Sequence, residues 1–472
     1  MSNLNKTILA LFLIPLSLIS QKNHLKNWAN SSVFQEATVA VMLADIDKDS
    51  ILFSHNAEKN MITASTMKLI TSAAGLKTLG PDFKFKTELR FSDTIVNGVL
   101  EGDLIIKGYG DPTLGSKYFY DQQTAFINQW VNEIEKLGIK EIKGNIIGDG
   151  SYYGKTTTPY GWQWSDISNY YGTSPEGLNV IDNQYIITFN SGTAGTTTTI
   201  KKIQPSVPYL ELTNKVISSD KSGDNSYILG GPNEYKKEIQ GTITANDSAF
   251  EVKGSIPNPS KFLAYLLLEA LKNKGVKIDG TYLSHFDQEI NPKSQLISTL
   301  NSPSLKEIIK ITNKYSINLF AEAIALEITK KVGAKDYQSA LNKVFNNEID
   351  FSKNTIADGS GLSPANTISA NNYYKVLRLM HRDKILHQPF MESLSVSGSD
   401  GTLKSFGQGK KFAGHFIGKS GYIGGIRCYA GFLKSAKGKN LALIIFVNHY
   451  SSENSVIKNK IEELVEQIHQ EF

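Results

Sequence analysis

The chain has 472 residues, of which 40% are hydrophobic and 20% are charged, a composition typical of a soluble globular protein. This length exceeds what one hydrophobic core usually supports, so two or three domains are expected. The net charge of +5, from 50 basic and 45 acidic residues scattered along the chain, gives no indication of nucleic-acid binding.

The chain begins with a short apolar segment. Lys6 precedes the mostly apolar residues 8–19, a stretch that is short for a membrane span and typical of the core of a signal peptide. We therefore expect residues 1–21 to be a signal peptide that directs the protein to the periplasm, with a retained membrane anchor as the alternative. The only cysteine, Cys428, lies far beyond this segment, so a lipoprotein anchor has no acceptor and no disulfide can form within the chain.

Ser65 and Lys68 form the first motif, a Ser-x-x-Lys string that follows a predicted β-hairpin over residues 38–53. The apolar run 67–76 has helical spacing and places Ser65 at a helix N-terminus. One turn later, Lys68 lies on nearly the same face, where its amine can reach the Ser65 hydroxyl. A serine hydroxyl beside a lysine amine is the nucleophile and base pair of acyl-transferases that use lysine instead of histidine.

The Ser-x-x-Lys string recurs at Ser218 and Ser455, so the string alone does not identify the nucleophile. The copy at Ser218 lies in residues 217–226, which lack hydrophobic periodicity and which we interpret as a solvated loop. The helical context therefore selects Ser65.

A long interval separates Lys68 from the next motif. Residues 69–315 number 247, far more than a connecting loop needs, and much of the interval consists of short strand-like runs between Thr- and Gly-rich turns. We expect residues 88–295 to be a β-rich insertion of one or two domains. It splits a catalytic domain formed by residues 22–87 and 296–472.

Ser316, Ile317 and Asn318 form the second motif, at a polar interruption between two helical segments. The first segment begins at Ser304, where Glu307 completes a possible capping box. A corner between two buried helices can project Ser316 and Asn318 into a cleft, and simple helix capping is the competing explanation.

Lys419, Ser420 and Gly421 form the third motif, which precedes a predicted hairpin over residues 429–447 and an amphipathic helix over 457–472. The missing side chain of Gly421 would let a substrate backbone lie along this strand, with Lys419 and Ser420 binding the terminal carboxylate. The charge of Lys419 and desolvation would both lower the pKa of Lys68. Hairpins at both chain ends predict one antiparallel sheet with helices packed on it.

The three motifs, in this order and around such an insertion, closely resemble the class C low-molecular-mass penicillin-binding proteins, the D-alanyl-D-alanine carboxypeptidase/endopeptidase family. Further strings that resemble this family are residues 108–114, 161–166, 358–363 and 398–403. The resemblance covers nearly the whole mature chain and implies a multidomain α/β protein with the penicillin-recognising serine-transferase fold. Ser420 and Tyr422 depart from it, because threonine is more frequent at both positions.

The resemblance also implies a role for each motif residue. Ser65 would be acylated, Lys68 would take its proton, and Ser316 would relay a proton toward the leaving amine. Asn318 would orient Lys68 and the substrate amide, while the backbone N–H groups of Ser65 and Tyr422 would form the oxyanion hole. The substrate-binding residues would be Lys419, Ser420, Gly421, Tyr422, Leu362 and Asp166.

Trp162, Trp164 and Asp166 lie within the insertion, in a string that resembles the family's substrate-side wall. Asp166 could pair with a free ammonium on the third residue of a stem peptide, while an indole covers the aliphatic chain. The alternative is that the tryptophans are core residues and that Asp166 caps a turn.

The expected function is therefore a serine D-alanyl-D-alanine carboxypeptidase, with a possible endopeptidase activity, that acts on peptidoglycan stem peptides in the periplasm. β-Lactam antibiotics would be covalent inhibitors, and no cofactor or metal is expected. The alternatives are a serine β-lactamase and a non-catalytic cell-wall-binding scaffold. The large insertion favours the peptidase over the β-lactamase.

Overall fold

The computed structural model describes residues 16–155, 157–288, 290 and 293–472. Residues 1–15 of the expected signal peptide lie outside this description, and residues 16–21 form the start of helix α1 (Leu16–Ala29). None of the helices in the described ranges is long and apolar enough to cross a membrane.

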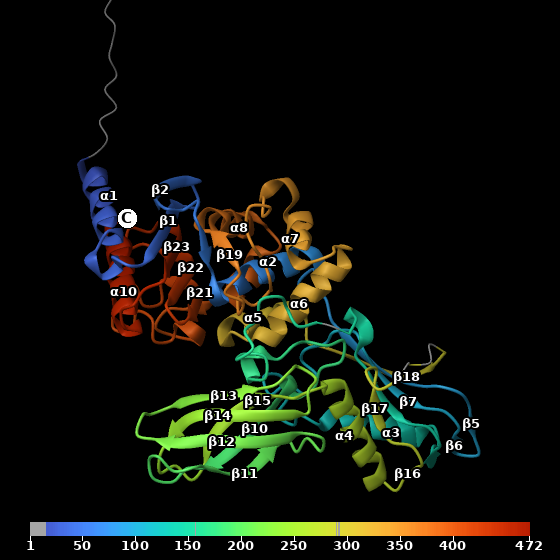
Figure 1. Ribbon diagram of the computed structural model, residues 1–472. Helices are drawn as coiled ribbons and strands as arrows, with labels where there is room; N and C mark the ends of the chain where they lie inside the picture. Colours follow the sequence, from blue (N-terminus) through green and yellow to red (C-terminus); the bar gives the residue numbers. More distant parts are fainter. Residues whose placement is uncertain (1–15, 156, 289, 291–292) are drawn as a thin grey trace, which may run out of the picture.

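A six-stranded antiparallel sheet forms the centre of the domain that carries the three motifs. Its strand order is β2-β1-β23-β22-β21-β20, so strands from both ends of the chain lie side by side (Figure 1). This arrangement confirms the expectation from the two terminal hairpins. The strands are β1 (Thr38–Asp45), β2 (Ser50–His55), β20 (Ser395–Val396), β21 (Phe416–Ile423), β22 (Ile426–Lys434) and β23 (Asn440–Asn448).

The central strands are buried on both faces, because successive side chains of a strand point to opposite sides. From β1, Ala40 and Met42 pack into one hydrophobic core, whereas Val39 and Val41 pack into the other. Helices α1 and α10 (Asn454–Glu471) contribute to the second core. The first core takes residues from α2 (Met67–Leu79), α5 (Leu305–Tyr315), α6 (Asn318–Lys331), α7 (Tyr337–Phe345), α8 (Ala370–Arg382) and α9 (His387–Ser393).

A short two-stranded ladder links the start of the nucleophile segment to the segment before α8. It pairs β3 (Asn60–Ile62) with β19 (Thr367–Ser369) in antiparallel fashion. The chain therefore enters the Ser65 turn from a strand that is fixed by residues about 300 positions away.

The region between α2 and α5 begins and ends with two paired strands. β4 (Lys86–Phe91) and β18 (Gln295–Asn301) are antiparallel neighbours, so the chain leaves and re-enters the catalytic domain at one place. The predicted boundaries of the insertion, residues 88 and 295, fall within these two paired strands.

The inserted region has its own hydrophobic core. It contains many strands, as expected, but helices α3 (Ala125–Lys136) and α4 (Pro259–Asn273) also pack in that core. Its remaining strands are β5 (Ile95–Val96), β6 (Val99–Leu100), β7 (Leu104–Gly108), β8 (Glu141–Ile142), β9 (Ile146–Asp149), β10 (Gln184–Asn190), β11 (Thr199–Gln204), β12 (Glu211–Ser219), β13 (Asp224–Leu229), β14 (Lys236–Thr244), β15 (Phe250–Ser255), β16 (Lys277–Ile278) and β17 (Tyr282–Ser284).

The expectation of a solvated loop over residues 217–226 was wrong at its two ends, which lie in β12 and β13, whereas the exposed residues 220–223 connect the two strands. Ser218 is a buried residue near the end of β12, and the exposed Lys221 lies in the turn that leads to β13. β12 pairs in parallel with β14, and within it only Val216 and Ser218 are buried, whereas its other residues are half-buried or exposed.

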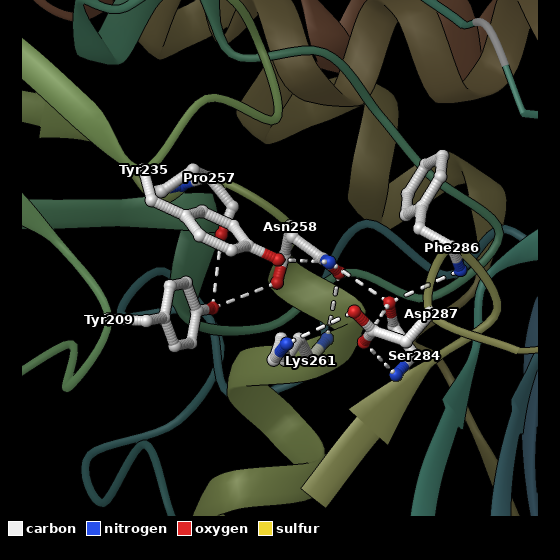
Figure 2. Close-up of polar contacts among 8 residues, drawn as sticks. All are labelled: Tyr209, Tyr235, Pro257, Asn258, Lys261, Ser284, Phe286 and Asp287. Carbon is white, nitrogen blue, oxygen red and sulfur yellow. Dashed lines mark hydrogen bonds and ion pairs between the residues drawn. The ribbon is translucent and has the colours of Figure 1, made fainter.

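A polar cluster around Asn258 joins α4 to the sheet of β12, β14 and β13 (Figure 2). Asn258 is the N-cap of α4, with a left-handed φ of 52°, and its side chain accepts a hydrogen bond from the Lys261 N–H at 3.0 Å. Its amide donates to the Tyr235 hydroxyl at 3.2 Å and to the Ser284 hydroxyl at 2.9 Å. Tyr209 donates to the carbonyl of Asn258 at 3.0 Å. One side chain therefore connects three parts of the inserted region.

Replacing Asn258 tests this joint. Asn258→Ala should lower the free energy of unfolding by about 2 kcal/mol, because it removes a helix cap and the two hydrogen bonds that the Asn258 amide donates to the Tyr235 and Ser284 hydroxyls. Asn258→Asp keeps the oxygen that caps α4 and should lower the free energy of unfolding by a smaller amount. Urea unfolding of both variants is the measurement, and a wild-type midpoint for Asn258→Ala would contradict the assignment.

Candidate active site

Ser65 lies in a short 3-10 turn, Ala64–Thr66, that continues directly into α2. The preceding residue, Ala64, has a φ of 43°, a left-handed conformation that is strained for a residue with a side chain. The turn places the Ser65 hydroxyl 3.1 Å from the amine of Lys68, so the predicted pair is brought together.

Lys68 is fully buried and contacts three acceptors from distant parts of the chain. Its amine lies 3.1 Å from Ser65 Oγ, 2.5 Å from Asn318 Oδ1 and 2.8 Å from the Ser360 carbonyl oxygen. Burial lowers the pKa of Lys68 to about 7, although the charges of Asp358 and Glu322 act in the opposite direction. An amine with this pKa is available as a base near neutral pH.

The expected effect of Lys419 on Lys68 needs correction. Desolvation is the main cause of the lowered pKa of Lys68, and the resolved effects of nearby charge raise it. The resolved effect of one lysine on the other is that of Lys68 on Lys419. Burial, and then the charge of Lys68, lower the pKa of Lys419 well below its usual value.

Ser316 and Asn318 lie at the corner between α5 and α6, as predicted. The capping box at Ser304 and Glu307 starts α5, and Ser316 ends it with a left-handed φ of 59°. Asn318 accepts from Lys68 and donates through Nδ2 to the Tyr171 carbonyl at 2.7 Å. The Ser316 side chain lines the groove described below and makes no hydrogen bond to another described residue.

Lys419 and Ser420 lie on β21, next to the nucleophile turn. Lys419 is fully buried, and its amine donates to the Ser420 carbonyl at 2.8 Å. The Ser420 hydroxyl lies 3.4 Å from the Thr402 carbonyl oxygen. Gly421 faces the nucleophile segment, because a Cβ at this position would lie 2.8 Å from the Thr63 carbonyl oxygen and 3.1 Å from Ser65 N. The close packing of the third motif against the first therefore explains why position 421 is a glycine, without any role in substrate binding.

A groove of about 860 Å³ passes over Ser65. Residues of the catalytic domain form one part of its lining, and residues of the inserted region form the other. From the first come Ser65, Ser316, Asn318, Gly361, Leu362, Pro364 and Tyr422–Gly424, and from the second come Gln163, Ser165, Asp166, Asn169–Tyr171, Asp224–Tyr227 and Lys253. The predicted Leu362, Asp166 and Tyr422 therefore share one groove with the nucleophile.

The two tryptophans of the predicted wall have different environments. Trp162 is buried and donates from its indole N–H to Asp358 Oδ2 at 2.9 Å, so the core interpretation holds for this residue. Trp164 is 57% exposed. Asp166 lies in the groove lining, where burial raises the pKa of its carboxyl and the Tyr171 hydroxyl lies 3.4 Å away.

Sequence reasoning missed Glu322, a buried carboxyl one turn after Asn318 on α6. It accepts hydrogen bonds from the N–H groups of Gly359 at 3.1 Å and Ser360 at 2.8 Å. Burial and the charge of Asp358 raise the pKa of Glu322 to about 8. The sequence does contain a sign of this residue, because Glu322 is the single charged residue in the apolar run 319–325. A charged residue in such a run is expected either to bind a buried partner or to have a function.

Comparisons with known proteins agree on one family. The model of the D-Ala-D-Ala carboxypeptidase 3 (S13) family matches residues 21–470. The D-alanyl-D-alanine carboxypeptidase DacB of Haemophilus influenzae is 26% identical over 448 residues, which cover 91% of this chain and 89% of that protein. The D-alanyl-D-alanine carboxypeptidase of Actinomadura sp. (strain R39) is 24% identical over 440 residues, which cover 88% and 78% of the two chains.

Solved structures show the same fold. The crystal structure of penicillin binding protein 4 (dacB) from Haemophilus influenzae matches with a TM-score of 0.81 and 23% identity, covering 94% of this chain and 99% of that one. A second structure of that protein, complexed with a novel beta-lactam, matches with a TM-score of 0.75 and 22% identity over the same shares. The penicillin-recognising fold expected from the motifs is therefore confirmed.

The pKa of Lys68 predicts the pH dependence of turnover. Lys68 acts as a base only when neutral, so activity should rise with pH through about 7. Activity should fall as Lys419 loses its charge, at a pH below that of an ordinary lysine, because its pKa is lowered. Measuring kcat/KM against pH tests both limbs, and an acid limb near pH 10 would contradict the assignment of Lys68.

Proposed function

The chain belongs to the D-Ala-D-Ala carboxypeptidase 3 (S13) family, and from this premise we propose that it cleaves D-alanyl-D-alanine termini of peptidoglycan stem peptides through an acyl-enzyme at Ser65. One observation carries the assignment of the nucleophile. The Lys68 amine contacts both the Ser65 hydroxyl and the Asn318 side chain in a fully buried position, as a lysine base requires.

Acylation starts with neutral Lys68, which takes the proton of Ser65 as the hydroxyl oxygen attacks the carbonyl carbon of the penultimate D-alanine. The oxyanion is stabilised by the N–H groups of Ser65 and Tyr422, each contributing on the order of 3 kcal/mol. The proton that Lys68 has taken passes through the hydroxyl of Ser316, which lines the groove, to the nitrogen of the departing D-alanine. Water then attacks the ester carbonyl carbon while Lys68 takes its proton, and Lys68 passes this proton to Ser65 Oγ as the ester bond breaks and the shortened peptide leaves with a free carboxyl group.

Residues on both sides of the scissile bond orient the substrate. Lys419 and Ser420 bind the terminal carboxylate, with Gly421 keeping β21 close to the nucleophile turn. Leu362 contacts the acyl-donor side, where Asp166 pairs with an ammonium on the stem peptide. An opposite charge in a partly buried groove contributes more than an exposed pair would.

The same groove supports an endopeptidase activity. It continues from Ser65 along residues 224–227 and Lys253 of the inserted region, which provides room for substrates longer than a dipeptide. We therefore include cleavage of D-alanyl cross-links in the proposal. Mass spectrometry of purified peptidoglycan before and after incubation separates trimming from cross-link cleavage.

The cellular location follows from the substrate. Peptidoglycan lies outside the cytoplasmic membrane, and the proposed signal peptide at residues 1–21 would deliver the protein to the periplasm. In the same proposal, residues 22–87 and 296–472 form the catalytic domain, and residues 88–295 form the insertion that completes its groove.

Benzylpenicillin tests the nucleophile. Its strained lactam imitates the acyl-donor amide, so it should form a covalent adduct at Ser65, and Ser65→Ala should abolish labelling and lower turnover by several orders of magnitude. Peptide mapping of the labelled protein is the measurement. An adduct at Ser218 or Ser455 would refute the choice of Ser65, and rapid hydrolysis of the adduct would favour the serine β-lactamase alternative.

Lys68→Arg tests the base. Guanidinium stays protonated, so the variant should retain the positive charge and lose nearly all acylation. The rate of penicillin labelling at Ser65 is the measurement, with thermal melting as the control for folding. Labelling within tenfold of the wild-type rate would remove Lys68 from the mechanism.

Asp166→Asn tests the acyl-donor subsite. The variant should lower kcat/KM about tenfold for peptides with a side-chain ammonium, because the pairing charge is lost. Short D-alanyl-D-alanine esters and penicillin, which lack that ammonium, serve as control substrates and should be little affected. Equal losses on all substrates would assign Asp166 to structure.

A further inference from the structure

Asp358 is a buried carboxyl whose oxygens accept hydrogen bonds from four N–H groups. Oδ1 accepts from Gly361 N at 2.7 Å and from the Asn366 side chain at 2.5 Å. Oδ2 accepts from Ser363 N at 2.6 Å and from the Trp162 indole at 2.9 Å. Both oxygens of this buried carboxyl group are therefore satisfied by donors of the protein.

One peptide group connects this carboxylate to Lys68. The carbonyl of the peptide between Ser360 and Gly361 accepts from the Lys68 amine at 2.8 Å, and the N–H of the same peptide donates to Asp358 at 2.7 Å. Hydrogen bonds at the two ends of one amide strengthen each other, because each polarises the group. A carboxylate on the N–H therefore makes the carbonyl a better acceptor for the lysine.

The same loop is in contact with the nucleophile turn. Gly361 has a φ of 80°, and a Cβ at this position would lie 1.8 Å from the Ala64 carbonyl oxygen. Ala64 is the strained residue before Ser65. The loop thus fixes the backbone of the nucleophile and the amine of its base at the same time.

We propose that Asp358 is a positioning residue for Lys68, which acts through the peptide between Ser360 and Gly361 to fix the amine beside Ser65. This inference rests on the proposed function, in which Lys68 is the base. Trp162 makes the inserted region part of the arrangement, because its indole is one of the four donors to Asp358.

Other titratable groups lie near Lys68 on the elements packed around it. Glu322 on α6, whose own pKa is raised by burial and by the charge of Asp358, has a smaller charge effect on Lys68 than Asp358 has. Lys419 on β21 is the neighbouring amine, and burial and the charge of Lys68 lower its pKa. Tyr337 on α7 and Tyr373 on α8 have a raised pKa through burial and stay neutral. Of the charges that raise the pKa of Lys68, that of Asp358 is the largest.

Asp358→Asn tests the inference in the full-length protein, since it keeps the shape of the side chain and removes the charge. The acid limb of the pH profile for Ser65 acylation by benzylpenicillin should move to lower pH by at least about half a unit, because the charge that favours the lysine ammonium is gone. The maximal acylation rate should also fall about tenfold, because the amine is held less well.

Ser363→Ala is the matched control. It removes the hydrogen bond of the Ser363 hydroxyl to the Gly161 carbonyl from the same loop without changing any charge, and its acid limb should stay at the wild-type pH. An unmoved limb in Asp358→Asn, or a limb that moves to higher pH, would overturn the inference.

Trp162→Phe provides a second test if Asp358→Asn does not fold. It keeps the ring in the core and removes one donor to Asp358, so acylation should slow several-fold in a folded protein. Wild-type acylation by this variant would contradict the coupling. Rapid labelling of Lys68→Arg would instead show that the proposed function fails, which separates the two hypotheses.

Discussion

The burial of Lys68 is the constraint on which the site depends. An amine removed from water must find hydrogen-bond acceptors within the protein, and Lys68 finds three, on the nucleophile turn, at the start of α6 and in the loop before α8. These segments lie up to about 290 residues apart, so the whole catalytic domain must be assembled before the base is in place. The same desolvation brings its pKa close to neutral, so the cost of burial produces the reactive form of the group.

Close backbone contacts hold the nucleophile. Ala64 is held in a left-handed conformation, and two glycines from different segments, Gly361 and Gly421, approach the turn so closely that a side chain on either would meet its backbone. Strain of this kind persists only where surrounding structure enforces it. Here the surrounding structure is β21 on one side and the loop at residues 358–363 on the other, and both belong to motifs that resemble the family.

Residues between α2 and α5 contribute to the candidate active site. Tyr171 accepts a hydrogen bond from Asn318, Trp162 donates to Asp358, and residues from 163–171, 224–227 and 253 line the groove. Its strands β4 and β18 leave and return at one place, and the Asn258 cluster ties α4 to the sheet that carries β13. An insertion anchored in this way can present a stable wall to substrate, because its position is set by buried contacts as well as by the chain connections.

Local sequence patterns determined the elements with strong periodicity and the identity of the motifs. The terminal hairpins, the helix after Ser65, the capping box at Ser304 and the order of the three motifs were predicted, because each depends on neighbours a few residues apart. The tertiary structure alone decided which charges surround Lys68, that Trp162 donates a hydrogen bond to Asp358 and that Ser218 is a buried residue of a strand. These features depend on contacts between residues far apart in the chain. A buried polar residue needs hydrogen-bond partners, and when these come from another segment, the residues next to it in the sequence do not identify them.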